Sequence, residues 1–402
     1  MKKGWQTKKL GEIYKIGSSK RVLQSQWKTE GVPFYRGREV TRLAADGFVD
    51  NELFISEEHF AELSNEYGVP KAGDIVITAI GTIGNSHVVR SADRFYFKDA
   101  SVLWMKRTAE VSSEFVNLWL KSPAFFDQLD RGNGATVDTL TIQKLQSVEI
   151  AVPPLAEQQR IVGLLDEAFE GLATAKANAE KNLQNARALF ESHLQSVFTQ
   201  RGPGWVEKKL GDVFEIGSSK RIMETEWTSA GVPFYGGKEI VKLAKFGSVV
   251  SNAHISEEKY QDYASKYDMP RKDDILITAR GTIGVGYVVQ EGDKFYYKDG
   301  NIISMRGKTP SNPHFVLYAF RSNVMTDQFG DLAGTTVRHL PIEKAKELVL
   351  RMPGFDAQNS VVKDIREIEA ETQRLARLYE RKLAALEALK KSLLHQAFSG
   401  EL

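Results

Sequence analysis

A glycine-led turn rich in hydroxyl and cationic side chains occurs twice in this chain, 200 residues apart. Hydroxyl groups, backbone amides and cationic side chains are the donors that phosphate oxygens accept, so the turn suits contacts to a phosphate backbone. A solvated surface turn would carry Lys and Arg as well, and the pattern leaves both interpretations open. The candidate residues are Ser18, Ser19, Lys20 and Arg21 in the first copy and Ser218, Ser219, Lys220 and Arg221 in the second.

Shortly after each turn, an aromatic pair is followed by cationic side chains. Residues 33–38 read Pro-Phe-Tyr-Arg-Gly-Arg, and residues 233–238 read Pro-Phe-Tyr-Gly-Gly-Lys. A guanidinium can donate two parallel hydrogen bonds to the edge of a guanine base. Pro-Phe-Tyr is more typical of a buried strand than of a contact surface, so the cations carry most of this hypothesis. The candidates are Tyr35, Arg36 and Arg38, with Tyr235 and Lys238 in the second copy.

A third shared segment runs from a β-type sequence into a Gly-Thr-Ile-Gly turn, at residues 77–84 and 277–284. Closely spaced glycines allow another backbone to approach, although an ordinary hairpin turn would need them equally. A fourth polar turn, Gly-Ala-Thr-Val or Gly-Thr-Thr-Val, follows at residues 134–137 and 334–337. The candidates in these two segments are Thr78, Gly81, Thr82 and Thr136, and in the second copy Thr278, Arg280, Thr282, Thr336 and Arg338.

The residue types that most enzymes and metal sites require are missing or wrongly spaced. The chain has no cysteine, and its 7 histidines form no His-x-His or His-x-x-x-His pair, so we expect no metal centre. Residues 231–238 have the wrong glycine spacing for a P-loop, and Glu239 occupies the place of its magnesium-binding Ser or Thr. Glu257 and Lys259 have a nuclease-like spacing that the first copy does not preserve. We therefore expect a binding protein that holds no catalytic residues and no cofactor.

The composition is that of an ordinary globular protein with balanced charge. Charged residues make up 26% of the chain and leave a net charge of +2 at pH 7, too little to indicate a polyanionic partner by itself. Any surface for nucleic acid must therefore be local. The N-terminal residues lack the apolar run of a secretion signal, and no stretch approaches the roughly 18 apolar residues of a membrane-spanning helix. These features and the absence of cysteine predict a cytoplasmic protein.

The recurring turns belong to a repeat that covers the whole chain at a constant offset of 200 residues. Of the 37 positions from Gly4 to Val40, 20 are identical in the second copy. A repeat unit this long is a domain with its own core. Short β-rich runs separated by Gly, Pro and Asn predict a mixed α/β domain at residues 1–154 and a similar one at residues 201–354.

Each domain is followed by a long segment with the composition of a helix. Residues 155–198 contain no proline and only two glycines, and residues 356–398 contain neither residue type. Apolar positions alternate spacings of three and four, with one extra four in the first segment, which predicts an antiparallel coiled coil within one chain. The alternative is a helix that lies flat on its own domain.

We expect spacer helices at residues 155–200 and 355–402. The seam positions are Ile161, Leu165, Ala168, Leu172, Ala175, Ala179, Leu183, Ala186, Phe190, His193 and Val197, and then Val361, Ile365, Ile368, Thr372, Leu375, Tyr379, Lys382, Leu386, Leu389 and Leu393.

With these features, the chain resembles the specificity subunit of type I restriction-modification systems over essentially its whole length. The resemblance is carried by the opening Gly4-Trp5 and Leu10-Gly11, by the Gly-Thr-Ile-Gly turns, and by two longer strings. These strings are Pro-Pro-Leu-Ala-Glu-Gln at residues 153–158 and Ala-Phe-Ser-Gly-Glu-Leu at residues 397–402. The second helix start departs from the pattern, since residues 352–358 read Met-Pro-Gly-Phe-Asp-Ala-Gln.

The resemblance implies a division of labour between this chain and its partners. In that family, two target-recognition domains each read one half of a bipartite double-stranded DNA site, and the paired helices hold them apart. Two methyltransferase subunits bind this scaffold and methylate adenine with S-adenosylmethionine. Translocating restriction subunits that use ATP and magnesium join them for cleavage. This chain would then select the DNA and catalyse none of the steps.

Two similar domains related by a pseudo-two-fold axis predict similar half-sites in inverted orientation, which together form a near-palindrome. A coiled-coil scaffold or adaptor whose two domains bind peptides is the alternative, and DNA binding discriminates between the two. The half-sites should differ where the copies differ, at Arg36 and Gly236, at Ile80 and Arg280, and at Asp138 and Arg338.

Overall fold

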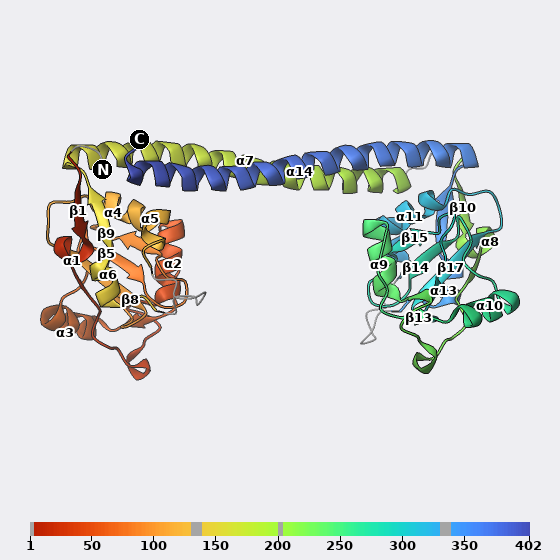
Figure 1. Cartoon of the computed structure of the whole chain (residues 1–402), viewed down its shortest axis with the longest axis horizontal. Coiled ribbons are helices and arrows are strands. Elements are labelled where there is room, and N and C mark those ends of the chain that lie inside the picture. Colours follow the sequence, from red (N-terminus) through yellow and green to blue (C-terminus); the bar gives the residue numbers. More distant parts are fainter. Residues whose placement is uncertain (1–3, 130–138, 200–203, 330–338) are drawn as a thin grey trace. The chain divides into compact units, whose positions relative to one another are not determined.

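The computed structural model describes residues 4–129, 139–199, 204–329 and 339–402, and the chain divides into two compact units (Figure 1). The first unit comprises Met1–Glu180 and Arg381–Leu402, and the second comprises Lys181–Glu380. Each unit therefore contains one globular domain, one half of each long helix and a hydrophobic core of its own. The expected fold class, mixed α/β domains with long paired helices, is confirmed.

In the described part of the first domain, the strands form three sheets. Their bounds are β1 Gln6–Lys9, β2 Tyr14–Gly17, β3 Val32–Tyr35, β4 Phe54–Ile55, β5 Ile75–Thr78, β6 Ser86–Val88, β7 Tyr96–Phe97, β8 Val102–Arg107 and β9 Glu149–Val152. The largest sheet is antiparallel, in the order β2, β8, β5, β6. A smaller sheet has the order β4, β3, β7, and its β3 and β7 run parallel. Antiparallel β1 and β9 join the two ends of the domain.

Short helices connect and cover these strands. They are α1 Leu10–Ile13, η1 Gln24–Gln26, α2 Gly37–Asp46, α3 Glu57–Tyr67, α4 Ser113–Leu120, α5 Pro123–Phe126 and α6 Ile142–Ser147. α2 packs on β5 and β6, and its Val40 is buried with Val76 of β5. It ends at Gly47, whose φ of 74° is left-handed and favours glycine. The N-terminus of α2 thereby lies beside the end of β5, which brings two of the candidate segments together.

The second domain repeats this order of elements at the same offset. Its strands are β10 Val206–Lys209, β11 Phe214–Gly217, β12 Val232–Tyr235, β13 His254–Ile255, β14 Ile275–Thr278, β15 Gly286–Val288, β16 Tyr296–Tyr297, β17 Ile302–Gly307 and β18 Val349–Met352. Its helices are α8 Leu210–Val213, η3 Glu224–Glu226, α9 Gly237–Phe246, α10 Glu257–Lys266, α11 Pro313–Arg321, α12 Asn323–Thr326, η4 Asp327–Phe329 and α13 Ile342–Glu347. Strand register is conserved as well, since Ile75 pairs with Met105 and Ile275 pairs with Met305.

In the first unit, the first half of α7 (Leu155–Thr199) runs antiparallel to the last half of α14 (Phe355–Ser399) (Figure 1). Ile161 near the start of α7 and Phe398 near the end of α14 belong to one core. Farther along the pair, Lys176 Nζ lies 2.8 Å from Glu387 Oε1. The ring of Phe398 also packs edge-on against that of Phe115 in the domain, with centroids 5.2 Å apart.

In the second unit, the other halves of the same helices pair in the same way. Phe198 near the end of α7 contacts Phe315 of the domain, with ring centroids 5.1 Å apart, and Ile365 of α14 is buried in the same core. Arg187 donates a hydrogen bond of 2.9 Å to Glu380 between the two helices. The predicted intramolecular antiparallel pairing is therefore confirmed within each unit.

The predicted seam is right for α7 and partly wrong for α14. Every seam position expected in α7 is buried or half-buried, including those after the extra spacing of four. In α14, Lys382 and Leu389 are exposed, and Leu383 occupies the seam in place of Lys382. The spacing from Tyr379 to the next seam residue, Leu383, is thus four instead of three. The α14 seam therefore contains one additional spacing of four, as the α7 seam does. A lysine in the seam would lose the hydration of its ammonium group, and the neighbouring leucine avoids that cost.

A buried glutamine fixes the start of each long helix to its own domain. Gln158 Oε1 accepts a hydrogen bond from the backbone amide of Ser112, and its Nε2 donates to the carbonyl of Pro153, both at 2.8 Å. Gln358 makes the same two hydrogen bonds in the second unit, both at 2.9 Å. The departure of residues 352–358 from the first helix start therefore leaves this anchor intact.

Candidate nucleic-acid interface

The serine-rich turns are held to the rest of their own domains by the serine hydroxyls. Ser19 Oγ donates to the carbonyl of Phe97 at 2.6 Å, and Ser18 Oγ accepts a backbone amide hydrogen bond of 3.2 Å. Ser218 and Ser219 repeat both contacts. These hydroxyls therefore shape the turn, and a phosphate would have to share them with the backbone.

The cations of these turns lie at the surface. Lys20 Nζ lies 5.2 Å from the centroid of the Tyr67 ring, and Arg21 Nε donates to Asp99 at 2.9 Å. The Arg21 side chain is 71% exposed, so this ion pair is weak and its guanidinium stays accessible to an anion. The second copy has the same two contacts, at 5.4 Å and 2.9 Å, for Lys220 and Arg221.

The two tyrosines of the second candidate segment pack into their domains. Tyr35 stacks on Phe95 with centroids 4.7 Å apart, and Tyr235 packs on Phe295 at 4.8 Å. Burial raises the pKa of both phenols above the ordinary value. The tyrosines therefore support the strand, as the Pro-Phe-Tyr sequence indicates, and the cations beside them are the accessible groups.

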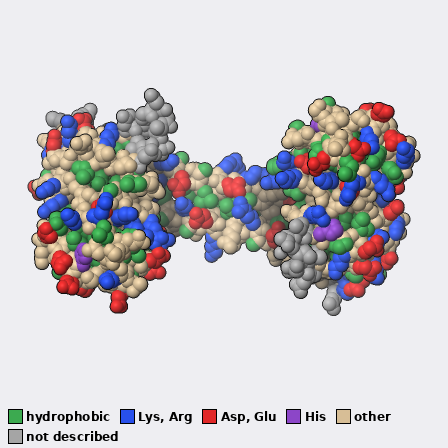
Figure 2. All heavy atoms as spheres, turned by 90° about the horizontal axis from the view of Figure 1, so that it is seen from below, with side chains coloured by type: hydrophobic (Ala, Val, Ile, Leu, Met, Phe, Trp, Pro, Cys, Tyr) green, Lys and Arg blue, Asp and Glu red, His purple; other side chains and the backbone are tan. Residues whose placement is uncertain are grey.

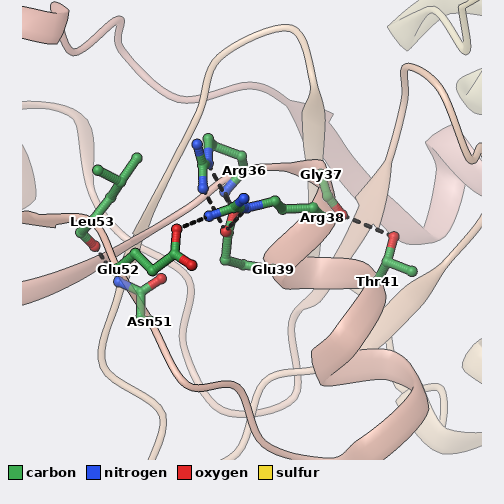
Figure 3. Close-up of polar contacts among 8 residues, drawn as sticks. All are labelled: Arg36, Gly37, Arg38, Glu39, Thr41, Asn51, Glu52 and Leu53. Atoms are coloured by element: carbon green, nitrogen blue, oxygen red, sulfur yellow. Dashed lines mark hydrogen bonds and ion pairs between the residues drawn. The ribbon is translucent and has the colours of Figure 1, made fainter. Parts of the chain in front are cut away.

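Figure 3 shows Arg36 and Arg38 converging on one carboxylate, that of Glu39 at the start of α2. Arg36 donates from Nε at 3.0 Å and from Nη2 at 2.7 Å, and Arg38 donates from Nε at 2.5 Å. The Glu39 side chain is only 3% exposed. Burial raises the pKa of Glu39, but the hydrogen bonds from the two arginines outweigh it and hold the pKa below the ordinary 4.5. Two guanidinium groups thus share one buried anion at this helix start.

A second carboxylate, that of Glu52, accepts from Nη2 of Arg38, whereas Glu39 accepts from Nε (Figure 3). Its side chain is 69% exposed, in contrast to the buried Glu39. An exposed ion pair contributes little to stability, so an incoming phosphate or base can replace Glu52 at low cost. Glu39 therefore holds Nε of Arg38 in place, whereas the partner of Nη2 can be exchanged for a ligand.

The second copy keeps the helix start and loses this cluster. The backbone amide of Gly236 donates to Glu239 at 2.9 Å, as that of Arg36 does to Glu39. Asn252 replaces Glu52, and Lys238 replaces Arg38. Within the described ranges, the exposed Lys238 ammonium has no hydrogen bond or ion pair. The second domain thus presents a cation without an internal counter-ion.

The Gly-Thr-Ile-Gly turns owe their shape to a buried threonine. Thr78 and Thr278 are each 1% exposed, and each Oγ1 donates at 2.5 Å to a carbonyl within the turn, that of Thr82 or Thr282. Gly81 has a φ of 78°, and no atom lies within 4 Å of the place of its missing Cβ. The buried threonines are thus structural, whereas Gly81 and the exposed threonines at the tip face open space.

In the second domain, the candidate segments meet around an open hollow of about 600 Å³. The hollow lies between the first turns of α9, the end of β14 and the residue before β17. Three cations from two elements line it, namely Lys238 and Lys242 of α9 and Arg280 after β14. The other lining residues are Gly237, Val241, Thr278, Gly281, Thr282 and Asn301.

The same place in the first domain carries different side chains. Thr41 of α2 donates to the Gly37 carbonyl at 2.9 Å and accepts from Asn85 at 3.0 Å. In the second copy, valines replace both Thr41 and Asn85. Ile80, 45% exposed, stands where the second copy has Arg280. Ser101 stands in place of Asn301. The two domains therefore share a scaffold and differ in the groups that this surface presents.

Two polar side chains of the hollow, those of Lys242 and Asn301, were not among the residues predicted from the sequence. Lys242 follows Lys238 by one helical turn, and this i, i+4 spacing is a signal that could have found it. Asn301 lies in no pattern of its own, because only the fold places it beside the turn that follows β14.

Three predicted residues, Thr136, Thr336 and Arg338, lie outside the described residues. The described part of the chain resumes at Thr139 in the first domain and at His339 in the second. Thr139 forms an isolated β-bridge with Ile80, and His339 forms one with Arg280.

The charge of the surface is mixed. Figure 2 shows Lys and Arg side chains interspersed with Asp and Glu side chains on the face that it presents of each unit. In the described parts of the chain, no group of three or more His, Asp or Glu is placed to hold a metal ion. Nor does any described helix have the length and apolar character needed to cross a membrane. Concentrations of positive charge, such as the α9 hollow, are therefore local.

The fold is that of known specificity subunits. The HsdS subunit from Thermoanaerobacter tengcongensis superposes with a TM-score of 0.65 at 18% identity, covering 100% of this chain and 98% of that one. A chain from a structure on complex assembly and conformational transition of the type I R-M system superposes with a TM-score of 0.77, also at 18% identity, covering 100% and 99%.

The chain belongs to the type I restriction modification DNA specificity domain family, whose sequence model matches residues 2–183 and again residues 203–380. A Haemophilus influenzae protein described as a type I restriction enzyme specificity subunit, S.HindORF215P, is 30% identical over 238 residues, which are 58% of this chain and 59% of that protein. The EcoBI specificity subunit of Escherichia coli is 23% identical over 303 residues, 67% of this chain and 62% of that protein. The chain thus spans about six tenths of the length of these curated relatives.

Proposed function

We propose that this chain is the sequence-specific DNA-binding subunit of a type I restriction-modification complex. Each domain reads one half of a bipartite double-stranded site, and the chain directs adenine methylation or cleavage by partner subunits without catalysing either. The observation that carries the proposal is the convergence of Lys238, Lys242 and Arg280 on one hollow of the second domain. A local cluster of cations on a nearly neutral protein is the feature expected of a DNA contact surface.

The expected partners are two methyltransferase subunits and translocating restriction subunits. S-adenosylmethionine, ATP and magnesium then belong to these partners, and this chain binds DNA with its side chains alone. Leu189 and Leu389 occupy equivalent positions of the two long helices and are 56% and 48% exposed, and we expect docked partners to cover them. Because such a complex acts on chromosomal DNA, we expect it to be cytoplasmic.

The proposal is tested by the binding of the full-length chain to duplex DNA of random sequence, with and without a co-expressed methyltransferase. Binding that weakens steeply with salt is expected, because phosphate contacts release counterions. Replacing both Lys238 and Lys242 with alanine should lower the affinity and reduce the salt slope by about two. The matched control is the double alanine variant of Lys208 and Lys209, which removes the same charge from β10.

A peptide-binding scaffold would behave differently. It would bind duplex DNA weakly or not at all, and the two double variants would have equal effects. Either result would contradict the proposal and favour the scaffold.

A further inference from the structure

We propose that Arg280 and Asn301 are the specificity-determining pair of the second domain and read two neighbouring base pairs, a guanine and an adenine. The inference rests on the proposed function and deepens it, because it names the reading groups and the bases. It also identifies one place where the two half-sites differ.

The fold places Arg280 and Asn301 at one hollow, on neighbouring segments of the chain. The backbone amide of Ala279 donates to the carbonyl of Asn301 at 2.8 Å, so the residue that precedes β17 faces the residue that follows β14. Arg280 is the next residue along the chain, and both side chains line the same hollow. A backbone hydrogen bond holds the two segments in register. The side chains of Arg280 and Asn301 can therefore contact adjacent base pairs.

Both side chains are available for a ligand. Within the residues that the structure describes, neither the Arg280 guanidinium nor the Asn301 side-chain amide has a hydrogen bond or ion pair. Other polar groups of this region are already used, as Thr278 Oγ1 donates to the carbonyl of Thr282 at 2.5 Å. A polar group that lines a hollow without an internal partner is ready to exchange water for a base edge.

The side-chain chemistry selects the bases. A guanidinium matches the two acceptors of guanine in the major groove, and a carboxamide matches the acceptor and donor of adenine. Lys238 and Lys242 are point charges on α9 that suit phosphates, which position the duplex and carry no sequence information. The hollow therefore combines two cations for the backbone with two planar groups for the bases.

The first domain lacks both reading groups at this place. Ile80 replaces Arg280, and an exposed isoleucine can contact the methyl group of thymine but cannot hydrogen-bond a guanine. Ser101 replaces Asn301, and its Oγ donates to the carbonyl of Asp99 at 3.4 Å. The half-sites are therefore expected to agree where the domains agree and to differ at these two base pairs.

Reciprocal exchange of the pair tests the inference in the full-length chain. One variant carries Arg280→Ile and Asn301→Ser, and the other carries Ile80→Arg and Ser101→Asn. Sites are selected from random duplex DNA by each variant and by the unchanged chain, and thermal unfolding verifies that each variant is folded. Lys242→Ala is the control, because loss of a phosphate contact should weaken binding uniformly across sequences.

The first variant should lose its preference at two neighbouring base pairs of one half-site, by roughly 5- to 150-fold per base pair, and keep the rest. The second should gain a guanine and an adenine at the equivalent place in the other half-site. Unchanged preferences accompanied by weaker overall binding would overturn the inference and leave the proposed function standing. Failure of the unchanged chain to select any sequence would overturn both.

Discussion

The guanidinium of Arg38 has two carboxylate partners, Glu39 and Glu52, which differ in burial. Both carboxylates accept from Arg38, but Glu39 is 3% exposed and Glu52 is 69% exposed. A buried anion that loses its partners pays a large desolvation cost, whereas an exposed one returns to water. Glu39 therefore orients Arg36 and Arg38 at the start of α2, and Glu52 is a replaceable neighbour.

Replacing Glu39 with Gln should destabilise the first unit by about 1–3 kcal/mol near neutral pH, because charge-assisted hydrogen bonds are lost. The fold lowers the pKa of Glu39, so its contribution is complete above the ordinary value of 4.5 and is lost as the pH falls through the lower folded value. The difference between the variant and the unchanged chain should therefore shrink below about pH 4.5. Urea unfolding at a series of pH values measures it.

Glu52→Gln is the matched control for Glu39→Gln, since it alters the other carboxylate on the same guanidinium. Its effect on the free energy of unfolding should stay within about 1 kcal/mol at every pH. Equal losses for the two variants, or a Glu39→Gln loss that is independent of pH, would contradict the assignment of Glu39 as the structural partner.

At the scale of elements, the long helices depend on a few buried contacts at their starts. Gln158 is 1% exposed and holds both a backbone amide and a carbonyl of its domain, and Gln358 is 3% exposed and does the same. The surrounding sequences differ, so the hydrogen bonds and not the local sequence define the junction. The junction determines the direction in which each helix leaves its domain.

Replacing Gln158 with alanine should cost the first unit about 1–3 kcal/mol, because the amide of Ser112 and the carbonyl of Pro153 lose their partner in a buried place. Hydrogen exchange at the Ser112 amide should accelerate accordingly. Gln358→Ala should have the same effect at the Asn312 amide in the second unit.

The neighbouring Gln159 provides the control for the Gln158 variant. Its side chain is exposed, so Gln159→Ala should change stability by no more than about 0.5 kcal/mol. Unchanged exchange at Ser112 in Gln158→Ala would show that the glutamine is not the anchor.

The periodic features of the sequence were the most predictable, and the contacts between distant segments were the least. The scarcity of proline and glycine located both long helices, and apolar spacing located the α7 seam, because helical burial follows a fixed period. The α14 seam was misplaced at Lys382, since spacing alone does not weigh the hydration of a charged side chain against a neighbouring leucine. Arg36 and Arg38 were predicted as accessible cations, but the pairing of Arg38 with Glu52 depends on a loop that returns to α2.

The hollow beside α9 is a second feature that the sequence could not predict, because it depends on contacts between distant segments. Its lining comes from three stretches separated by about 20 to 40 residues, so no local pattern contains it. Arg280 was found because the two copies differ there, whereas Asn301 became visible only beside β14. Comparison of the internal copies thus located where the two surfaces differ, and the structure identified the residues that lie next to Arg280 in the fold.

At the scale of the whole molecule, the duplication separates what the two domains share from what distinguishes them. Both keep the same strand registers and the same buried glutamine at the helix start. They differ in the hollow and in the charge balance at the start of α2 and α9. Conserved junctions with different reading surfaces imply that one domain can be exchanged for the other.

A chain in which residues 6–152 are replaced by residues 206–352 should therefore fold and select an exact inverted repeat. The replacement begins at β1 and ends at β9, so it keeps the chain length, the Gln158 anchor and both long helices. Two identical domains leave no source of difference between the half-sites, and each should match the half-site of the second domain. Site selection from random duplex DNA measures this, with the reverse replacement as control, which should give a repeat of the other half-site. Persistence of two different half-sites in either chain would show that recognition depends on the position of a domain as well as on its surface.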